Sequence, residues 1–254
     1  MSVVASELSL NREFRVGNTL NHATKLFFSA HFPKFCAISG VTLAPLLITA
    51  IGAGQPIDEL GNDHAAAFAM WTGAGALLRL VLGPIGTAVS LYGAYQAMRG
   101  QPFTVGDSFR AAWGRLGAVF GAALLGGLIT IVLMMLLIVP GIMALCALYV
   151  ALPACVVERL GPVNCLRRSR ELTRGARWRI FGMILVVGLI GAMLGGTAGG
   201  VVGATRNSVA IGIVTYVAGV IGSAFSAVLA AVAYRDLRIA KEGIDIDSLA
   251  KVFE

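Results

Sequence analysis

The densest charge in the sequence is a group of seven arginines between residues 159 and 179, offset only by Glu158 and Glu171. A guanidinium carries a permanent positive charge and planar donors that match the oxygens of phosphate and carboxylate groups. At an anionic membrane surface each such residue gains on the order of 1 kcal/mol. The group is therefore a topology determinant on a solvated face, a contact for an acidic lipid or phosphate headgroup, or a docking site for an acidic partner protein. Its members are Arg159, Arg167, Arg168, Arg170, Arg174, Arg177 and Arg179.

Residue types that usually carry catalysis are scattered. The three histidines form no recognisable pattern, and H-E-x-x-H, G-x-S-x-G, Walker A and G-x-G-x-x-G motifs do not occur. The long apolar stretches contain no Asp or Glu, whereas intramembrane enzymes and proton-coupled transporters usually carry ionisable groups at depth. We therefore expect no catalytic residue, no cofactor and no enzymatic activity. Cysteine placement, with Cys36, Cys146 and Cys155 in apolar stretches and Cys165 outside them, predicts neither a metal site nor a disulfide.

Glycine recurs at every fourth position of the fifth apolar stretch, at Gly191, Gly195, Gly199 and Gly203. This spacing places the four on one helix face and removes every side chain there, so that another backbone can approach closely. We interpret the face as an internal packing surface; a pore lining and a dimer interface are the alternatives. The sixth stretch offers a mate in Gly212, Gly219, Gly222 and Ser226.

The composition places these residues in a membrane. The 254 residues are 57% hydrophobic and 13% charged, whereas soluble domains are about a quarter charged. Five uncharged stretches can cross a hydrocarbon core of about 30 Å, namely 35–57, 80–98, 116–157, 180–205 and 207–234. The third is long enough for two crossings, and Pro140-Gly141 near its middle predicts the turn between them, because proline lacks an amide donor and glycine takes positive φ.

The sequence thus predicts an all-α integral membrane protein with six transmembrane helices. A single membrane domain spans residues 1–254, with a cytoplasmic amphipathic segment at 1–34, the six-span bundle at 35–234 and a cytoplasmic tail at 235–254. If both termini are cytoplasmic, all of the 20 basic residues except Arg79 and Arg206 lie inside, as the positive-inside rule requires. The basic surplus then reflects topology, and we expect no nucleic-acid partner. Arg79 either snorkels to the outer headgroups, or lines an anion path or pairs with an acidic partner.

Amphipathic stretches precede the odd-numbered spans. The first places Val16, Leu20, Ala23 and Phe27 at helical spacing, and the others cover residues 108–120 and 162–181. We expect cytoplasmic interfacial helices, each leading into a transmembrane hairpin, so that the chain repeats one unit three times. The alternative is that any positively flanked helix pair shows this pattern. Residues 61–78, with Trp71, are expected to form an outer interfacial or re-entrant extension of the second span.

Several short runs in the second half of the chain carry a family resemblance. They are Val139-Pro140-Gly141-Ile142-Met143, Leu152-Pro153, Val156-Val157-Glu158, residues 166–173, and the closing segments 234–238 and 241–243. In these runs the chain resembles a superfamily of uncharacterised bacterial six-span proteins, which includes the UPF0259 membrane proteins and the membrane domain fused to some glycerophosphodiester phosphodiesterases. The resemblance implies a bacterial inner-membrane location and a related helical fold, and it implies no activity. The matching positions of most interest are Pro140, Gly141, Pro153, Glu158 and Ser169.

These observations favour a non-enzymatic inner-membrane protein that acts through protein or lipid contacts, as an organiser, assembly factor or accessory subunit of a membrane complex. The expected partners are the phospholipid bilayer, including anionic lipid, and a membrane-protein partner or a second copy of the chain. The alternative function is a passive channel or carrier for a small or lipidic solute, with the fifth and sixth spans bounding the path.

Overall fold

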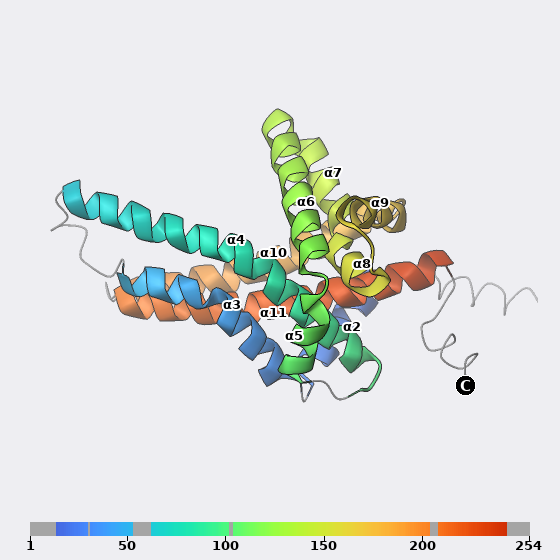
Figure 1. Cartoon of the computed structure of the whole chain (residues 1–254), viewed down its shortest axis with the longest axis horizontal. Helices are drawn as coiled ribbons and strands as arrows, with labels where there is room; N and C mark the ends of the chain where they lie inside the picture. Colours follow the sequence, from blue (N-terminus) through green and yellow to red (C-terminus); the bar gives the residue numbers. More distant parts are fainter. Residues whose placement is uncertain (1–13, 30, 53–61, 102–103, 204–207, 243–254) are drawn as a thin grey trace, which may run out of the picture.

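The computed structural model describes residues 14–29, 31–52, 62–101, 104–203 and 208–242, and it is helical throughout these ranges apart from short turns (Figure 1). Surroundings of side chains are described for most of these residues, but not for residues 46–52 or for much of 62–72 and 194–211. The helices are α2 (Val16–Phe27), α3 (Phe32–Gly52), α4 (Asn62–Met98), α5 (Val105–Trp113), α6 (Leu116–Leu136), α7 (Ile138–Leu148), α8 (Ala151–Glu158), α9 (Pro162–Thr173), α10 (Arg177–Gly203) and α11 (Ser208–Glu242).

Four segments of the described chain are long and apolar enough to cross a membrane. They are Gly73–Met98 in α4, α6, the α7–α8 segment Ile138–Glu158, and Gly212–Glu242 in α11. Two bent helix pairs, α2 with α3 and α9 with α10, raise the number of candidate spans to six. Large aliphatic side chains on α6, α7 and α10 face outward, which a water-soluble protein of this size would avoid over so wide a surface. The all-helical fold therefore fits a multi-pass membrane protein.

The helices form two groups that diverge from a shared base. Helix α11 contacts α3, α4 and α10, and these helices extend together toward one side of the view, whereas the α6–α7 hairpin projects away from them (Figure 1). Most of the largest fully buried side chains belong to α2, α3, α9, α10 and α11, and they include Phe27, Phe35, Leu172, Ile180 and Tyr234. The core thus lies at the base, where the short helices cover the ends of the long ones.

Short helices precede long ones three times along the chain, in the order α2–α3–α4, α5–α6–α7 and α9–α10–α11. Helix α2 buries Ala23 and Phe27, as the amphipathic pattern predicts, and the Phe27 ring meets the ring of Phe225 edge-on at 5.5 Å. Residues 62–78 continue directly into the second span as part of α4. The threefold sequence repeat stays a prediction, although the order of helices accords with it.

The turn between α6 and α7 corrects the prediction at Pro140-Gly141. The chain reverses at Leu137, which is extended with φ −156° and ψ 129°. Pro140 lies in the first turn of α7. Backbone amides in that turn have no acceptor within the helix, so the missing amide hydrogen of proline costs no helical hydrogen bond. Gly141 lies where α7 crosses α6, since a Cβ there would be only 2.7 Å from the Cα of Met134. Proline and glycine therefore lie within the first residues of α7, after its start at Ile138, and they do not form the turn of the hairpin.

The predicted glycine face of α10 also differs from expectation. Gly191 and Gly195 are exposed, and a Cβ added to either would meet no other atom within 4 Å. Among the described residues they therefore do not mediate packing of α10, while the surroundings of Gly199 and Gly203 lie outside the described part. On α11, Gly219 lies near Leu43 of α3, and the Tyr216 hydroxyl donates to the Gly40 carbonyl at 2.7 Å. Of the predicted small residues of α11, Gly219 thus packs against α3, whereas Gly222 meets no described neighbour within 4 Å.

Candidate functional site

Helix α9 organises the arginine-rich region because its two faces differ. Its first residue is Pro162, whose fixed φ suits the first position of a helix. The buried residues Cys165, Leu166, Ser169, Leu172 and Thr173 follow helical spacing along one face. The opposite face is exposed and carries Val163, Arg167, Arg170 and Glu171.

The buried face of α9 is fixed to the end of α7. The hydroxyls of Ser169 and Thr173 both donate to the carbonyl of Ala147, at 2.8 and 3.2 Å. Ala147 lies in the last turn of α7, where helical carbonyls lack an intrahelical amide partner. Burying that carbonyl without a donor would be costly, so the two hydroxyls stabilise the break between α7 and α8. Ser169, one of the positions that carry the family resemblance, thus has a structural role.

A disulfide joins α8 to α9, in contrast to the prediction from the cysteine placement. Cys155 and Cys165 form the bond, with their Cα atoms 5.2 Å apart, and both are fully buried. The prediction was wrong because α9 folds back along α8, which brings a residue of the span next to a residue of the following helix. Cys36 and Cys146 are free thiols.

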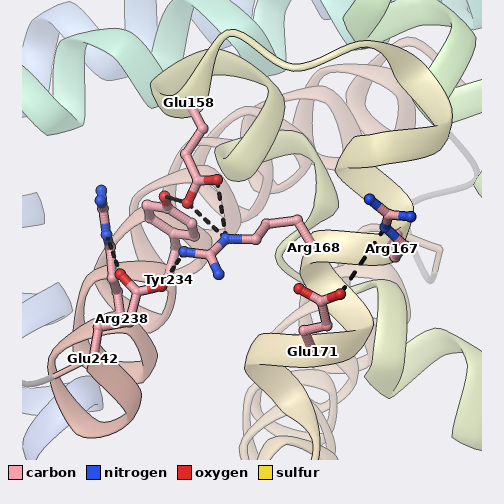
Figure 2. A network of polar contacts seen from close by, with 7 residues as sticks. All are labelled: Glu158, Arg167, Arg168, Glu171, Tyr234, Arg238 and Glu242. Carbon is pink, nitrogen blue, oxygen red and sulfur yellow. Dashed lines mark hydrogen bonds and ion pairs between the residues drawn. The ribbon is translucent and has the colours of Figure 1, made fainter.

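One member of the arginine group points inward, where it joins a charge network between α8, α9 and α11 (Figure 2). The Arg168 Nε lies 2.9 Å from both carboxylate oxygens of Glu158, and a second guanidinium nitrogen pairs with Glu242. Arg238 pairs with the other oxygen of Glu242 at 2.9 Å. The Tyr234 hydroxyl donates to Glu158 at 2.7 Å.

The network is electrically balanced, since two carboxylates face two guanidinium groups. The Glu158, Arg168 and Glu242 side chains are only 16–23% exposed. Partial burial lowers the pKa of Arg168, but its hydrogen bonds to Glu242 and Glu158 outweigh that effect and raise the pKa above its ordinary value. A permanently charged guanidinium offers no proton for exchange, and the Nε and one terminal nitrogen of Arg168 are already occupied by the two carboxylates. We therefore assign the network to holding α9 against α8 and α11.

The exposed face of α9 borders a groove of about 1320 Å³, which we name the arginine-rimmed groove. Its walls come from α6, α7, α9 and the start of α10, and they are mainly aliphatic and aromatic. The charged lining residues are Arg167, Arg170, Glu171, Arg174 and Arg177. Four arginines and one glutamate leave three net positive charges. The Nε of Arg177 is buried and has no hydrogen-bond partner among the residues that the structure describes.

The structure therefore divides the seven predicted contact arginines. Arg167, Arg170, Arg174 and Arg177 line the groove together. Arg168 is paired in the network, and Arg179 donates to the Phe14 carbonyl at 3.1 Å. Arg159 is exposed and adopts the left-handed conformation with φ 55° that ends α8. Helical spacing alone would have placed Arg168 on a different face from Arg167 and Arg170. A count of charges did not consider that Arg168 could pair with the carboxylates at the ends of α8 and α11.

Arg79 lies away from this region. Its side chain is exposed on α4, six residues inside the candidate span that begins at Gly73, and it borders a small pocket with Pro84 and Phe120. Both interpretations of Arg79, snorkelling or a functional contact, stay open predictions.

The model of one protein family matches residues 73–237, well over half of the chain. The chain belongs to this family, described as Domain of unknown function (DUF7847). The DUF7847 match contains the whole arginine-rimmed groove and the Glu158, Arg168 and Tyr234 part of the network, and it ends just before Arg238. An uncharacterised family is what the resemblance implied, whereas kinship with UPF0259 proteins stays a prediction. No curated protein and no solved structure shows a significant match to the chain.

Proposed function

We propose that this chain is a non-enzymatic membrane protein that acts through contacts with lipid or protein, as an organiser, assembly factor or accessory subunit of a membrane complex. The observation that carries the proposal is the division of α9 into two faces. Its inner face is fixed by the network, the disulfide and the bonds to Ala147. Its outer face presents exposed arginines above an apolar groove. A rigid cationic rim beside an apolar wall suits a partner that is both acidic and apolar.

The proposal includes a topology. Six spans, with both termini in the cytoplasm of a bacterium and the protein in its inner membrane, place α2, α5 and α9 at the cytoplasmic interface. The 99° bend between α9 and α10 supports an interfacial helix that turns into a span. Exposed Trp113 and Trp178 lie next to the starts of α6 and α10, where indole rings favour the headgroup level. Reporter fusions after residues 113 and 242 are expected on the cytoplasmic side, and an outside report for either would contradict this topology.

The contact function is tested by purifying the full chain from native membranes in mild detergent and identifying what stays bound by mass spectrometry. We expect a defined protein or phospholipid, retained at constant stoichiometry. The double substitution Arg167→Gln with Arg170→Gln should reduce retention, because both arginines face outward from α9. Arg99→Gln with Arg110→Gln is the matched control, since these residues are also exposed but do not line the groove.

Reconstituted vesicles separate this function from transport. The contact function predicts no solute flux above that of protein-free vesicles. Saturable flux that a bulky residue at Gly195 abolishes would contradict it and would support a channel or carrier instead. Gly195 is informative because its face of α10 is open in the isolated chain.

A further inference from the structure

We infer that the arginine-rimmed groove binds one phospholipid with an anionic headgroup, its phosphate at the arginines and its acyl chains against α6 and α7. The inference rests on the proposed contact function and specifies the contact: a lipid, at one site, in defined orientation. Three features carry it, namely the polarity of the walls, the size of the groove and the unpaired donor of Arg177.

The helices that line the groove differ in polarity, since those on one side are uncharged and those on the other carry its charges. Its α6 and α7 walls consist of uncharged residues, among them Ile129, Leu133, Val139, Ile142 and Met143. All charged lining residues come from α9, the α9–α10 turn and the first turn of α10. Trp178 lies at this boundary with 82% of its side chain exposed, as expected for an indole at headgroup level. A phospholipid has the same sequence of polarity, from acyl chain to phosphate.

The size of the groove also suits a lipid. Its volume of about 1320 Å³ exceeds the range of about 300–1,000 Å³ typical of sites for small molecules. An extended apolar chain can fill such a space, whereas an extended peptide segment would place backbone amides against aliphatic walls without hydrogen-bond partners. Because the groove lies beside candidate spans, the bilayer itself supplies the ligand.

The cationic end has unused binding capacity. The Arg177 Nε is buried without an acceptor, and Arg170 and Arg174 are exposed. Arg167 approaches Glu171 only at 4.0 Å, which leaves its guanidinium available. Phosphate oxygens match guanidinium donors in pairs, and the N-terminus of α10 adds a favourable field for an anion. A zwitterionic headgroup brings a compensating positive charge, so the three net charges of the groove favour anionic lipid.

The test is native mass spectrometry of the delipidated full chain, titrated with phosphatidylglycerol or with phosphatidylcholine of the same acyl chains. We expect one phosphatidylglycerol to bind in preference to phosphatidylcholine. Arg174→Gln with Arg177→Gln should weaken the binding of phosphatidylglycerol at least about tenfold. The control pair, Arg99→Gln with Arg110→Gln, removes the same charge outside the groove and should leave affinity within about twofold of wild type.

A second variant pair tests the apolar wall. Met143 lines the groove and is 46% exposed, so Met143→Trp should occupy the acyl-chain space and reduce phosphatidylglycerol binding without unfolding the chain. Met135→Trp is the control, because Met135 is 82% exposed on α6 and outside the groove. Equal melting temperatures of the two variants show that folding is unaffected; if Met143→Trp unfolds, Val163→Trp on the exposed face of α9 replaces it.

Three results would overturn the inference. If lipid binding depends neither on headgroup charge nor on the substitutions of either variant pair, the bound lipid is only annular lipid. Glycerol 1-phosphate that displaces the lipid, together with full binding to the Met143→Trp variant, would show a site for free phosphate. Loss of binding in the control pair would show a diffuse surface charge effect. If phosphatidylglycerol does not bind but a protein partner still co-purifies without solute flux, the contact function stands and only the lipid site fails.

Discussion

Replacing Arg168 with alanine should destabilise the chain far more than replacing its neighbour Arg167. Arg168 lies between two carboxylates that are themselves largely buried, and its Nε contacts both oxygens of Glu158 at 2.9 Å (Figure 2). Without the guanidinium, Glu158 keeps only the Tyr234 hydroxyl, and Glu242 keeps only Arg238. Two negative charges would then face each other across the junction of α8 and α11.

The magnitude follows from burial. Removing one partner of a buried ion pair costs about 3–5 kcal/mol, and a hydrogen bond to a charged group contributes about 1.5–3 kcal/mol. The network retains 16–23% exposure, which lets water solvate the remaining carboxylates in part. We therefore expect Arg168→Ala to lower the free energy of unfolding by about 2–3 kcal/mol. Arg167 and Glu171 are 76% and 60% exposed and 4.0 Å apart, so Arg167→Ala should cost less than about 0.5 kcal/mol.

The assay is unfolding of the full chain in mild detergent, titrated with sodium dodecyl sulfate and followed by circular dichroism. Arg168→Lys should be intermediate, since an ammonium cannot bridge two carboxylates as a guanidinium does. Arg168→Met combined with Glu158→Gln should recover much of the loss, because Glu242 and Arg238 still pair with each other and no unpaired charge then stays buried. Equal stabilities of the Arg168→Ala and Arg167→Ala variants would refute the role of the network.

Three further predictions concern other contacts. Gly195→Leu should leave the stability of the isolated chain unchanged or raise it slightly, because the Cβ position of Gly195 is open. Gly86→Leu should destabilise the chain, because Gly86 is buried against α3. Comparable losses of stability in both variants would contradict this packing. In unfolded, unreduced protein, thiol alkylation should modify two cysteines and, after reduction, also Cys155 and Cys165; four modified thiols without reduction would exclude the disulfide. Ser169→Ala should cost about 1 kcal/mol in detergent unfolding, as one of two bonds to the end of α7 is lost, and no change would show that water replaces it.

The sequence was sufficient for the positions of the helices. Uncharged stretches near 20 residues long and amphipathic stretches before them are local patterns, and the structure has helices in each. The placement of Pro140 in the first turn of α7 could also have been predicted, since proline favours the first turn of a helix as well as a turn between helices. The missing amide donor of proline and the conformational freedom of glycine suit a turn between helices equally well, so these residue types alone do not separate the two arrangements.

The sequence could not predict which helices pack against each other. In a bilayer, lipid tails are as apolar as leucine, so an apolar or glycine-rich face does not reveal whether it meets lipid or another helix. Gly195 and Gly219 both lie on small-residue faces, yet the first is open and the second lies against α3. Contacts such as Arg168 with Glu242, 74 residues apart, depend on the tertiary fold, which helical periodicity does not specify.

The distribution of arginines along α9 decides how much of its charge is available for a ligand. Neighbouring residues of a helix point about 100° apart, so Arg168 faces the interior while Arg167 and Arg170 face the groove. Glu158 and Glu242 neutralise the inward charge, which fixes the helix without drawing on the outward ones. In the proposed lipid site the anion affinity would therefore come from the four arginines that line the groove, whereas Arg168 holds the helix in place. Substitutions on the two faces should accordingly separate lipid binding from stability.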